Sequence, residues 1–556
     1  MKKTVLFMLL ALVCATTSAQ ITQKDKDDFF GTEDKDDFFG KQTKEDFYSK
    51  NDPGFAAERQ KMYENYNKFR KEMLKDYSDF VRKAWKDYQA SPAVEAPKDE
   101  HVEPQLAPGA DAETASLFSK LFGRKHKRTK QPVVKPKPVE QKPVQYTVQD
   151  VVKPEPVAPQ AQPQVPAEPK VEKANDYMSF TVFGTECKVR IGDNCRFRLP
   201  SVKSNDVADA IEHVFPGQQF ENMLYDCLQE RKSHGFSDWA YYQMLLSLTR
   251  QFYGDTNEAV LAQAFLYSQS GYKMRLAHDD SRLYMLAATR HFIYNKLFYS
   301  IDGDWYFLLS GSQAKSLGIC EASFPKESTL SLRISTSQVL SDNPTIQRTI
   351  KSRKNPDFSV TITSNKNYID FYDTYPSSMV ENNFMTRWAM YANSPIEPGI
   401  RKQLYPQLKE KLAGYNQVDA VQQLLWWMHG MVDLDGTMSN SDTFLYRYDE
   451  DVWGCDRAFF GEETLFYPYC DCEDRSILLS HLVRDLVGLD VVLVYYPGHL
   501  AMAVNFTEDI PSNCDYITLD GRKFVICDPT YIGSRVGETM SGMENQPTTV
   551  ILLQRS

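Results

Sequence analysis

The sequence predicts an α+β protein whose globular body follows a long N-terminal arm. Proline, charge and short repeats dominate residues 20–53 and 91–174, which leaves too few apolar side chains for a core there. From Asn175 onward, helical and strand-like apolar patterns share one continuous region. Residues 388–556 end in a helix pattern followed by three strand patterns. The net charge of −10 argues against a nucleic-acid partner.

Residues 1–19 are expected to form a secretory signal peptide. Two lysines precede the short apolar run Val5–Cys14, and a Thr-Ser-Ala sequence before residue 20 suits a signal peptidase. The apolar run is too short to span a bilayer, and we expect no integral membrane span later in the chain. A lipoprotein attachment at Cys14 is the less favoured alternative, because Val13 is large. The mature protein is therefore expected to be exported, either periplasmic or associated with the cell envelope.

Residues 20–53 carry a repeat with a period of nine residues. An aspartate followed by two aromatic residues recurs at Asp28-Phe29-Phe30, Asp37-Phe38-Phe39 and Asp46-Phe47-Tyr48. Copies this short cannot bury a core, so we expect them to be disordered. They are either a solvated tail or a multivalent docking motif for an envelope partner, since exposed aromatic pairs favour contact with another surface.

Residues 54–90 predict an amphipathic helix. Apolar side chains from Met62 to Tyr88 recur with a period of eleven residues, and the intervening positions are charged. That period favours a right-handed coiled coil, so the helix is expected to need a partner.

Residues 91–174 predict a proline-rich linker. Fourteen of the 29 prolines lie between Pro92 and Pro169, a composition that favours extended conformations. The basic cluster at 120–130 is either a solvated charge run or a contact for an anionic surface. We expect the linker to separate the arm from the body, so that a chain starting near Asn175 folds by itself.

Residues 175–387 are expected to form a mixed helix and strand scaffold domain without a catalytic group of its own. Met178–Pro200 alternates like two strands joined at Gly192-Asp193-Asn194. Asp206–Tyr272 is mostly helical in pattern, and Ser281–Leu297 predicts a further helix.

A candidate nucleophile opens a regular helix pattern in residues 388–556. The apolar positions after Cys472 share one helical face, and Gly488 ends the pattern. The positive end of a helix dipole favours a thiolate, which makes a cysteine there nucleophilic. Glu473 and Asp474 suit the first turn for the same reason, although their charge opposes thiolate formation.

Two partners for this thiol follow on predicted strands. Leu489–Tyr496 is an almost continuous apolar run, typical of a buried strand, and Pro497-Gly498 turns the chain before His499 begins the next strand. The Asp520-Gly521 turn leads to a third strand that ends at Asp528. If these strands pair, the imidazole takes the thiol proton and the carboxylate fixes its tautomer.

This segment resembles the transglutaminase-like superfamily of papain-type thiol enzymes. The resemblance lies in Cys-x-Asp-x-Ser at Cys472, Asp474 and Ser476, in the strand-borne His499, and in Asp-Pro-Thr at 528–530, in the family's order. It covers about a third of the chain, residues 388–556. It implies a papain-like fold with Cys472, His499 and Asp528 as catalytic residues and without a cofactor.

Two features depart from the family's pattern. Leu500-Ala501-Met502 stands where the family usually has an aromatic residue soon after the histidine. No upstream residue is an obvious oxyanion donor, and the indole N–H of Trp453 is the candidate that the sequence offers.

The other cysteines suggest no metal site. An odd number, nine, remains after the expected cleavage, which leaves at least one free thiol in an oxidising compartment. Cys187 and Cys195 flank a hairpin-like sequence and are a candidate pair. Cys470-x-Cys472 has no second pair with zinc spacing, so we expect no metal there.

The expected function is thiol-dependent acyl chemistry on a protein or peptide amide, by hydrolysis or by transfer to an amine. The alternative is a non-catalytic envelope scaffold that keeps the transglutaminase-like fold to bind extended peptides. The resemblance supports the reaction class, because a fold alone does not fix it.

Overall fold

The computed structural model describes residues 53–97, 101–110, 115, 143–155, 161–163 and 177–554, with gaps at 312–313, 325, 336, 381–382, 430–443 and 545. The chain divides into two compact units, Met1–Glu72 and Met73–Ser556. All contacts given below lie within Met73–Ser556. The expected signal peptide, the aromatic repeats and the basic cluster at 120–130 lie outside the described residues.

Helix α4 (Pro53–Val81) ends earlier than the sequence pattern predicts. After it, the backbone turns through two hydrogen bonds to the Phe80 carbonyl, each 3.0 Å long. Trp85–Gln89 then forms strand β1, which pairs antiparallel with β11 (Ser316–Cys320). The helix prediction for residues 82–90 is therefore wrong, because pairing with a distant strand outweighs the local helical period.

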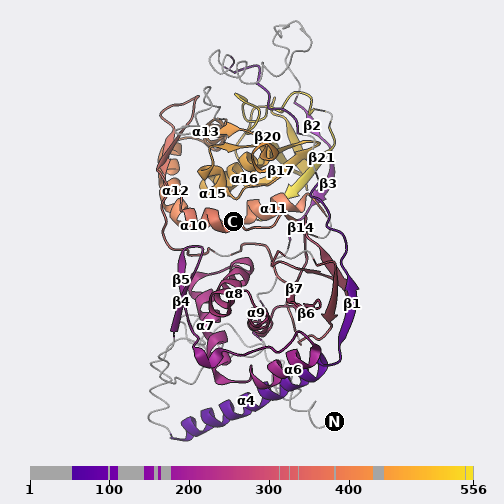
Figure 1. Cartoon of the computed structure of the whole chain (residues 1–556). Helices are drawn as coiled ribbons and strands as arrows, with labels where there is room; N and C mark the ends of the chain where they lie inside the picture. Colours follow the sequence, from indigo (N-terminus) through magenta and orange to yellow (C-terminus); the bar gives the residue numbers. More distant parts are fainter. Residues whose placement is uncertain are drawn as a thin grey trace, which may run out of the picture. The chain divides into compact units, whose positions relative to one another are not determined.

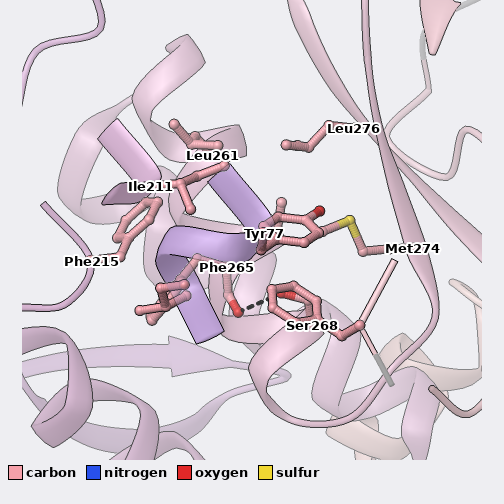
Figure 2. A pocket seen from close by; sticks show the side chains of 11 residues that line it. Tyr77, Ile211, Phe215, Leu261, Phe265, Ser268, Met274 and Leu276 are labelled. Atoms are coloured by element: carbon pink, nitrogen blue, oxygen red, sulfur yellow. Dashed lines mark hydrogen bonds between the residues drawn. The ribbon is translucent and has the colours of Figure 1, made fainter. Parts of the chain in front are cut away.

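The last part of α4 packs on the body of the protein through its apolar face. Tyr77 stacks on Phe324, with ring centroids 3.9 Å apart. Figure 2 shows Tyr77 among side chains that include Ile211 of α6 (Ser204–His213) and Phe265 of α9 (Asn257–Gln269). The end of α4 around Tyr77 thus packs on its own unit, and the need of the whole helix for a partner stays a prediction.

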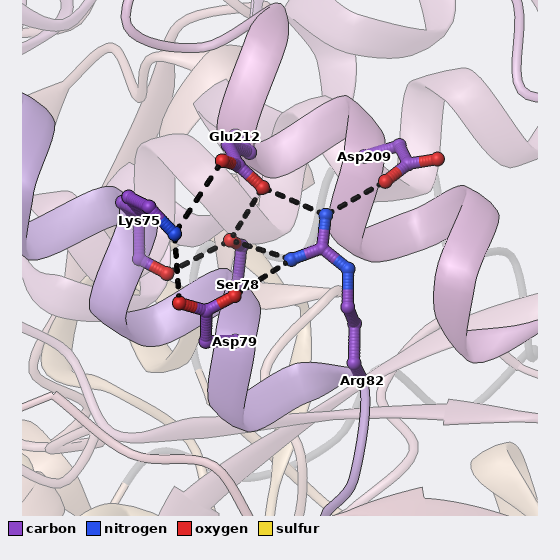
Figure 3. A network of polar contacts seen from close by, with 6 residues as sticks. All are labelled: Lys75, Ser78, Asp79, Arg82, Asp209 and Glu212. Carbon is purple, nitrogen blue, oxygen red and sulfur yellow. Dashed lines mark hydrogen bonds and ion pairs between the residues drawn. The ribbon is translucent and has the colours of Figure 1, made fainter.

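A polar network joins α4 to α6 beside this apolar contact (Figure 3). Arg82, just after α4, donates to Asp209 and to Glu212 of α6 at 2.7 Å each. The same guanidinium donates to Asp79 at 3.0 Å, which ties it back to its own helix. A network of several ion pairs fixes the orientation of one helix against the other better than a single exposed ion pair does.

The first sheet has six strands in the order β1-β11-β6-β7-β10-β9. Its other strands are β6 (Met274–His278), β7 (Leu283–Thr289), β9 (Phe298–Ile301) and β10 (Asp304–Phe307). Helix α9 packs against β6 and β7, next to α8 (Asp238–Tyr253), and α7 (Gln218–His234) packs on β5 (Thr185–Arg190) (Figure 1). The helix predicted at Ser281–Leu297 is wrong: every side chain of β7 is buried, so the strand shows no alternation.

The described residues also form four small two-stranded pairs. These are β4 (Tyr177–Val182) with β5 (Thr185–Arg190), β8 (His291–Ile293) with β14 (Ser378–Val380), β12 (Arg348–Lys351) with β13 (Ser359–Ile362), and β15 (Leu445–Tyr446) with β16 (Tyr469–Cys470). Short helices α10 (Lys366–Tyr372) and α14 (Asp449–Trp453) lie between them in sequence. The β4–β5 turn is at Phe183-Gly184, so the turn predicted at Gly192-Asp193-Asn194 is wrong.

The second sheet has seven strands in the order β2-β19-β20-β18-β17-β21-β3. Three of its four central strands form as predicted, as β17 (Asp490–Tyr496), β18 (His499–Asn505) and β20 (Arg522–Cys527), and β19 (Tyr516–Leu519) is the fourth. The turn at Pro497-Gly498 joins β17 to β18, and Gly498 takes the positive φ of 77° that such a turn requires. The Asp520-Gly521 turn joins β19 to β20 with both residues at positive φ.

Helix α16 (Cys472–Leu482) is central to this half of the unit, and all of its residues are buried. It packs on β17 and β18 and is covered by α11 (Thr386–Asn393), α13 (Gln417–Met428) and α15 (Gly461–Phe466); Figure 1 shows α16 against the sheet. Helix α12 (Pro398–Leu412) packs on β13 nearby. Two separate sheets with helices packed on them give the predicted α+β class.

Two edge strands of the second sheet come from the expected linker. Strand β2 (Gln145–Tyr146) pairs parallel with β19, and β3 (Val148–Val152) pairs parallel with β21 (Thr548–Leu552). The linker prediction for 91–174 is therefore wrong at these positions, and a chain cut at Asn175 loses both edges of the sheet as well as β1. The strands are too short to stand out from the surrounding prolines.

Candidate active site

The three predicted catalytic residues each stand at one end of a regular element. Cys472 is the first residue of α16, His499 is the first residue of β18, and Asp528 directly follows β20. Their exposed fractions are only 4%, 1% and 1%. All three side chains are thus closed off from solvent in this structure.

His499 and Asp528 are in direct contact. Strands β18 and β20 pair antiparallel, and this brings His499 Nε2 to 2.8 Å from Asp528 Oδ2. The other carboxylate oxygen accepts backbone N–H bonds from Thr530 at 2.9 Å and Tyr531 at 3.2 Å. Burial alone would raise the pKa of Asp528, but the electrostatic interaction and hydrogen bond with His499, together with the Thr530 N–H bond, lower it. The carboxylate is therefore ionised and held in one orientation.

A second histidine, not singled out by its sequence, braces the Asp528 backbone. His429 Nδ1 lies 3.3 Å from the Gly533 amide, which donates to it, so Nε2 carries the proton and donates to the Asp528 carbonyl at 3.2 Å. Burial lowers the pKa of His429 to about 4 and keeps the ring neutral. A lone histidine after an apolar helix gives no sequence signal for this role.

Cys472 and His499 line the same small cavity, of about 10 Å³. This is room for about one water molecule. The second ring nitrogen of His499, Nδ1, is buried and has no hydrogen-bond partner among the described residues. Because Nε2 is bonded to Asp528, Nδ1 is the nitrogen left to exchange a proton with a group in the cavity.

The thiol is protonated in this closed arrangement, contrary to the expectation of a thiolate. Cys472 Sγ lies 3.2 Å from Glu473 Oε2 and donates to it. Burial, and then the nearby carboxylates of Glu473 and Asp471, raise the pKa of Cys472 well above its ordinary value. The helix dipole does not overcome these effects. The exposed cysteine in the described region is instead Cys455.

Glu473 keeps its charge despite being buried. Burial opposes ionisation, but Arg387, whose guanidinium lies 3.9 Å away, and hydrogen bonds from Asp471 and Cys472 lower its pKa. The sequence indicated Glu473 only as a first-turn acid. The structure makes it the hydrogen-bond acceptor of the thiol.

Trp388, and not the Trp453 suggested by the sequence, lies at the Cys472 cavity as a candidate oxyanion donor. Trp453 lies against Tyr467, with ring centroids 5.2 Å apart, and away from the residues that line the Cys472 cavity. Trp388 of α11 lines that cavity, is 1% exposed, and stacks on Tyr495. Its indole N–H has no partner among the described residues. It is therefore an unused donor beside the thiol.

Three groups of side chains in the described residues bring potential metal ligands within 4.8 Å of one another. They are Cys187 with Glu230 and His234, Asp449 with Asp471 and Asp474, and Asp471 with Cys472 and Glu473. His234 Nε2 already lies 3.2 Å from a Glu230 carboxylate oxygen. Burial, and then the charge of a neighbouring carboxylate, raises the pKa values of these three aspartates well above the ordinary value: that neighbour is Asp474 for Asp449, and Glu473 for Asp471 and Asp474. Protons relieve the repulsion there. The absence of a metal remains a prediction.

The predicted disulfide pair is not formed in this structure. Cys187 and Cys195 are both buried, and no disulfide joins them. Burial is the main reason that the pKa of the Cys187 thiol is raised, to about 12. Such a thiol is a poor nucleophile for exchange.

A segment of the expected linker lies across the site. Residues His101–Ala110, called the strap below, form backbone hydrogen bonds with the body and turn at Pro108-Gly109. Val102 N–H donates to the Gly498 carbonyl at 2.9 Å, next to His499. His101 lines the cavity together with Cys472. Its proline-rich sequence gave no indication of this contact.

Among the described helices, none combines the length and the apolar character needed to cross a membrane. Comparisons of the chain with protein-family models, with curated proteins and with solved structures found no match.

Proposed function

We propose that this protein catalyses thiol-dependent acyl chemistry on a protein or peptide amide. The observation that carries the proposal is the His499–Asp528 contact, which leaves His499 Nδ1 unpaired at the cavity that Cys472 also lines. The resemblance to the transglutaminase-like superfamily supports the same reaction class and the same three residues. No step in the proposed chemistry uses a cofactor.

The reaction begins with transfer of the thiol proton from Cys472 to His499 Nδ1. The thiolate then attacks the amide carbon, and a covalent bond from sulfur to carbon forms as the carbonyl oxygen takes up the electron pair. Collapse of this intermediate breaks the carbon–nitrogen bond, and the imidazolium returns its proton to the leaving amine. Water or a second amine then attacks the thioester, which gives hydrolysis or transfer and restores the thiol.

In this reaction Asp528 stabilises the positive charge on His499, and Trp388 stabilises the negative charge on the carbonyl oxygen. Asp528 accepts a hydrogen bond from the Nε2–H of His499, which leaves the lone pair on Nδ1, and the carboxylate later stabilises the imidazolium. The unpaired indole N–H of Trp388 is placed to donate to the oxygen that becomes negative. In the resting state the Cys472 thiol donates a hydrogen bond to Glu473. Proton transfer to His499 therefore requires the thiol to rotate away from Glu473.

The test combines an amide-hydrolysis assay and an amine-incorporation assay on denatured, alkylated casein. Cys472→Ala is expected to abolish both activities while the unfolding temperature stays nearly unchanged. Cys455→Ala is the matched control, because that thiol is exposed and lies outside the cavity, and it should retain full activity. Turnover that survives Cys472→Ala would place the chemistry elsewhere.

The second candidate function is a non-catalytic scaffold that binds extended peptides. The buried and protonated state of Cys472 favours it, because such a thiol is unreactive at rest. Peptide binding that is equal in the native protein and in Cys472→Ala, with no turnover even when the strap is displaced, would support the scaffold.

We further propose that the protein acts after export, in the periplasm or at the cell envelope, on an envelope protein or peptide. The support is the sequence alone: a signal-peptide pattern and aromatic repeats suited to docking. Fractionation of cells that make the tagged protein tests this. Recovery of the full-length, unprocessed chain with the cytosolic fraction would contradict it.

A further inference from the structure

The strap runs from the turn just before His499 to the loop that follows Asp528. At one end, Val102 N–H donates to the carbonyl of Gly498 at 2.9 Å. At the other end, Ala107 N–H donates to the Ile532 carbonyl, and Ile532 N–H donates to the Gln105 carbonyl, both at 2.9 Å. Leu106 and Ile532 form a parallel β-bridge. The strap is thus bound through its backbone, as an added strand would be.

Its side chains contribute apolar contact as well. Pro104 and Ala107 are buried, and Ala107 packs in one core cluster with Tyr146, Ile526 and Tyr531. Val102 packs against the same cluster. A surface that buries side chains of a bound segment while pairing with its backbone is suited to peptides.

His101 closes the end of the strap nearest to the nucleophile. Its ring stacks on Tyr448 with centroids 4.6 Å apart, and Nε2 lies 2.9 Å from Glu450. The cavity beside Cys472 that His101 lines is only about 10 Å³. A peptide therefore cannot reach the thiol while His101 stays in place.

We infer that His101–Ala110 occupies the track in which an extended polypeptide substrate binds, so that this segment of the chain is a built-in competitor of the substrate. The claim that the strap competes with a substrate rests on the proposed acyl chemistry. The claim that the strap covers Cys472 does not. The class of substrate is an unfolded or flexible segment of protein, because the Gly498 and Ile532 backbone groups recognise an extended main chain rather than a particular side chain.

The test removes one backbone hydrogen bond of the strap. Val102→Pro lacks the N–H that bonds to Gly498, whereas Val102→Ala shortens the side chain and keeps the bond. Both are made in a Cys455→Ser background, so that the exposed thiol does not consume the reagent. Alkylation of Cys472 by iodoacetamide at pH 8.5 (about the ordinary pKa of a thiol) is followed by mass spectrometry of the Cys472 peptide.

Alkylation of Cys472 is expected to be at least about tenfold faster in Val102→Pro than in Val102→Ala, which corresponds to about 1.4 kcal/mol in favour of the closed strap. A synthetic peptide with the sequence of residues 101–110 should slow alkylation of Val102→Pro again, and a scrambled peptide should not. If both variants react at the same slow rate while folded, the strap does not cover the site. His101→Ala, which opens the cavity directly, provides a second reading if Val102→Pro does not fold.

The same variants separate this inference from the proposed function. Faster alkylation without any amide turnover would uphold the covering strap and reject the acyl chemistry. Amide turnover of casein that is equal in Val102→Pro and Val102→Ala would uphold the chemistry and reject the competing strap.

Discussion

The hydroxyl of Ser476 donates a 3.0 Å hydrogen bond to the carbonyl oxygen of Leu500. Both residues are fully buried, so water does not compete for this bond. It joins α16 to β18 one helical turn after Cys472 and one residue after His499. This bond therefore fixes the distance between Cys472 and His499, although neither residue takes part in it.

Ser476→Ala is expected to lower the free energy of unfolding by about 1–2 kcal/mol, because it removes one buried hydrogen bond and leaves its acceptor with one partner fewer. Ser480→Ala is the matched control on the same helix. The Ser480 hydroxyl donates at 2.7 Å to Ile477 within α16, so its loss should cost less and should not disturb β18. Urea unfolding measures both, and equal losses would contradict the cross-linking role of Ser476.

Asp528→Asn is expected to reduce amide turnover by about four orders of magnitude, the effect seen when the orienting carboxylate of a related triad becomes an amide. The amide can donate to His499 Nε2, which favours the tautomer with its proton on Nδ1. That nitrogen then has no lone pair for the thiol proton. The change should leave the strap and the unfolding temperature nearly as they are.

Asp520→Asn is the control for this carboxylate. Asp520 has a positive φ of 49° in the turn between β19 and β20, a conformation that asparagine also adopts readily. Activity should therefore persist in Asp520→Asn. Full activity of Asp528→Asn would mean that Asp528 has no catalytic role and only forms the turn at the end of β20.

Tyr77→Ala tests whether the end of α4 is part of the body. Tyr77 is 7% exposed and stacks on Phe324, so its loss leaves a large cavity between α4, α6 and α9. The free energy of unfolding should fall by about 3–5 kcal/mol, as for other large aromatic side chains. Lys75→Ala removes an exposed pair with Asp79 of the same helix and a longer pair, of 3.7 Å, with Glu212 of α6, and should have a much smaller effect. A loss no larger than that of Lys75→Ala would mean that α4 is held elsewhere.

Glu462 is expected to make the protein less stable as pH rises. Burial raises the pKa of Glu462 from 4.5 to about 7, so the folded state binds a proton that the unfolded chain releases at lower pH. The corresponding stabilisation is fully present below pH 4.5 and is lost as pH rises through 7. Glu462→Gln removes this ionisation and should be more stable than the native protein by about 1–3 kcal/mol at pH 8.

The same comparison at pH 5 provides the check, because native Glu462 is mostly protonated there and the two proteins should then unfold at nearly the same urea concentration. Glu410→Gln, on the exposed surface of α12, should change stability equally little at both pH values. An unchanged difference between pH 5 and pH 8 for Glu462→Gln would contradict the raised pKa.

The elements that carry Cys472, His499 and Asp528 were predictable because their signals are local. The apolar run of β17 and the Pro497-Gly498 and Asp520-Gly521 turns specify strands and their order without knowledge of distant residues. In contrast, the Phe183-Gly184 turn was missed, because a phenylalanine at positive φ is not a usual turn signal and Gly192-Asp193-Asn194 is a stronger one.

The chemical state of the site was not predictable in the same way. The protonation of Cys472 depends on burial and on Glu473 and Asp471, whose charges are set by side chains from other elements, Arg387 among them. Trp388 and His101 reach the cavity from segments that no local pattern connects to it. Proximity of this kind is a property of the folded chain and leaves no periodicity in the sequence.

The edge strands β2 and β3 have a consequence for how the protein is made. They are synthesised long before the strands they flank, and β3 must wait for β21, which lies almost four hundred residues further along the chain. Contacts between such distant segments form slowly, because a long loop has to close before they give any stabilisation. Until then, both borders of a strongly apolar sheet stay open to pairing with other molecules. We therefore expect folding to be slow, and the half-made protein to depend on chaperones more than the finished one does.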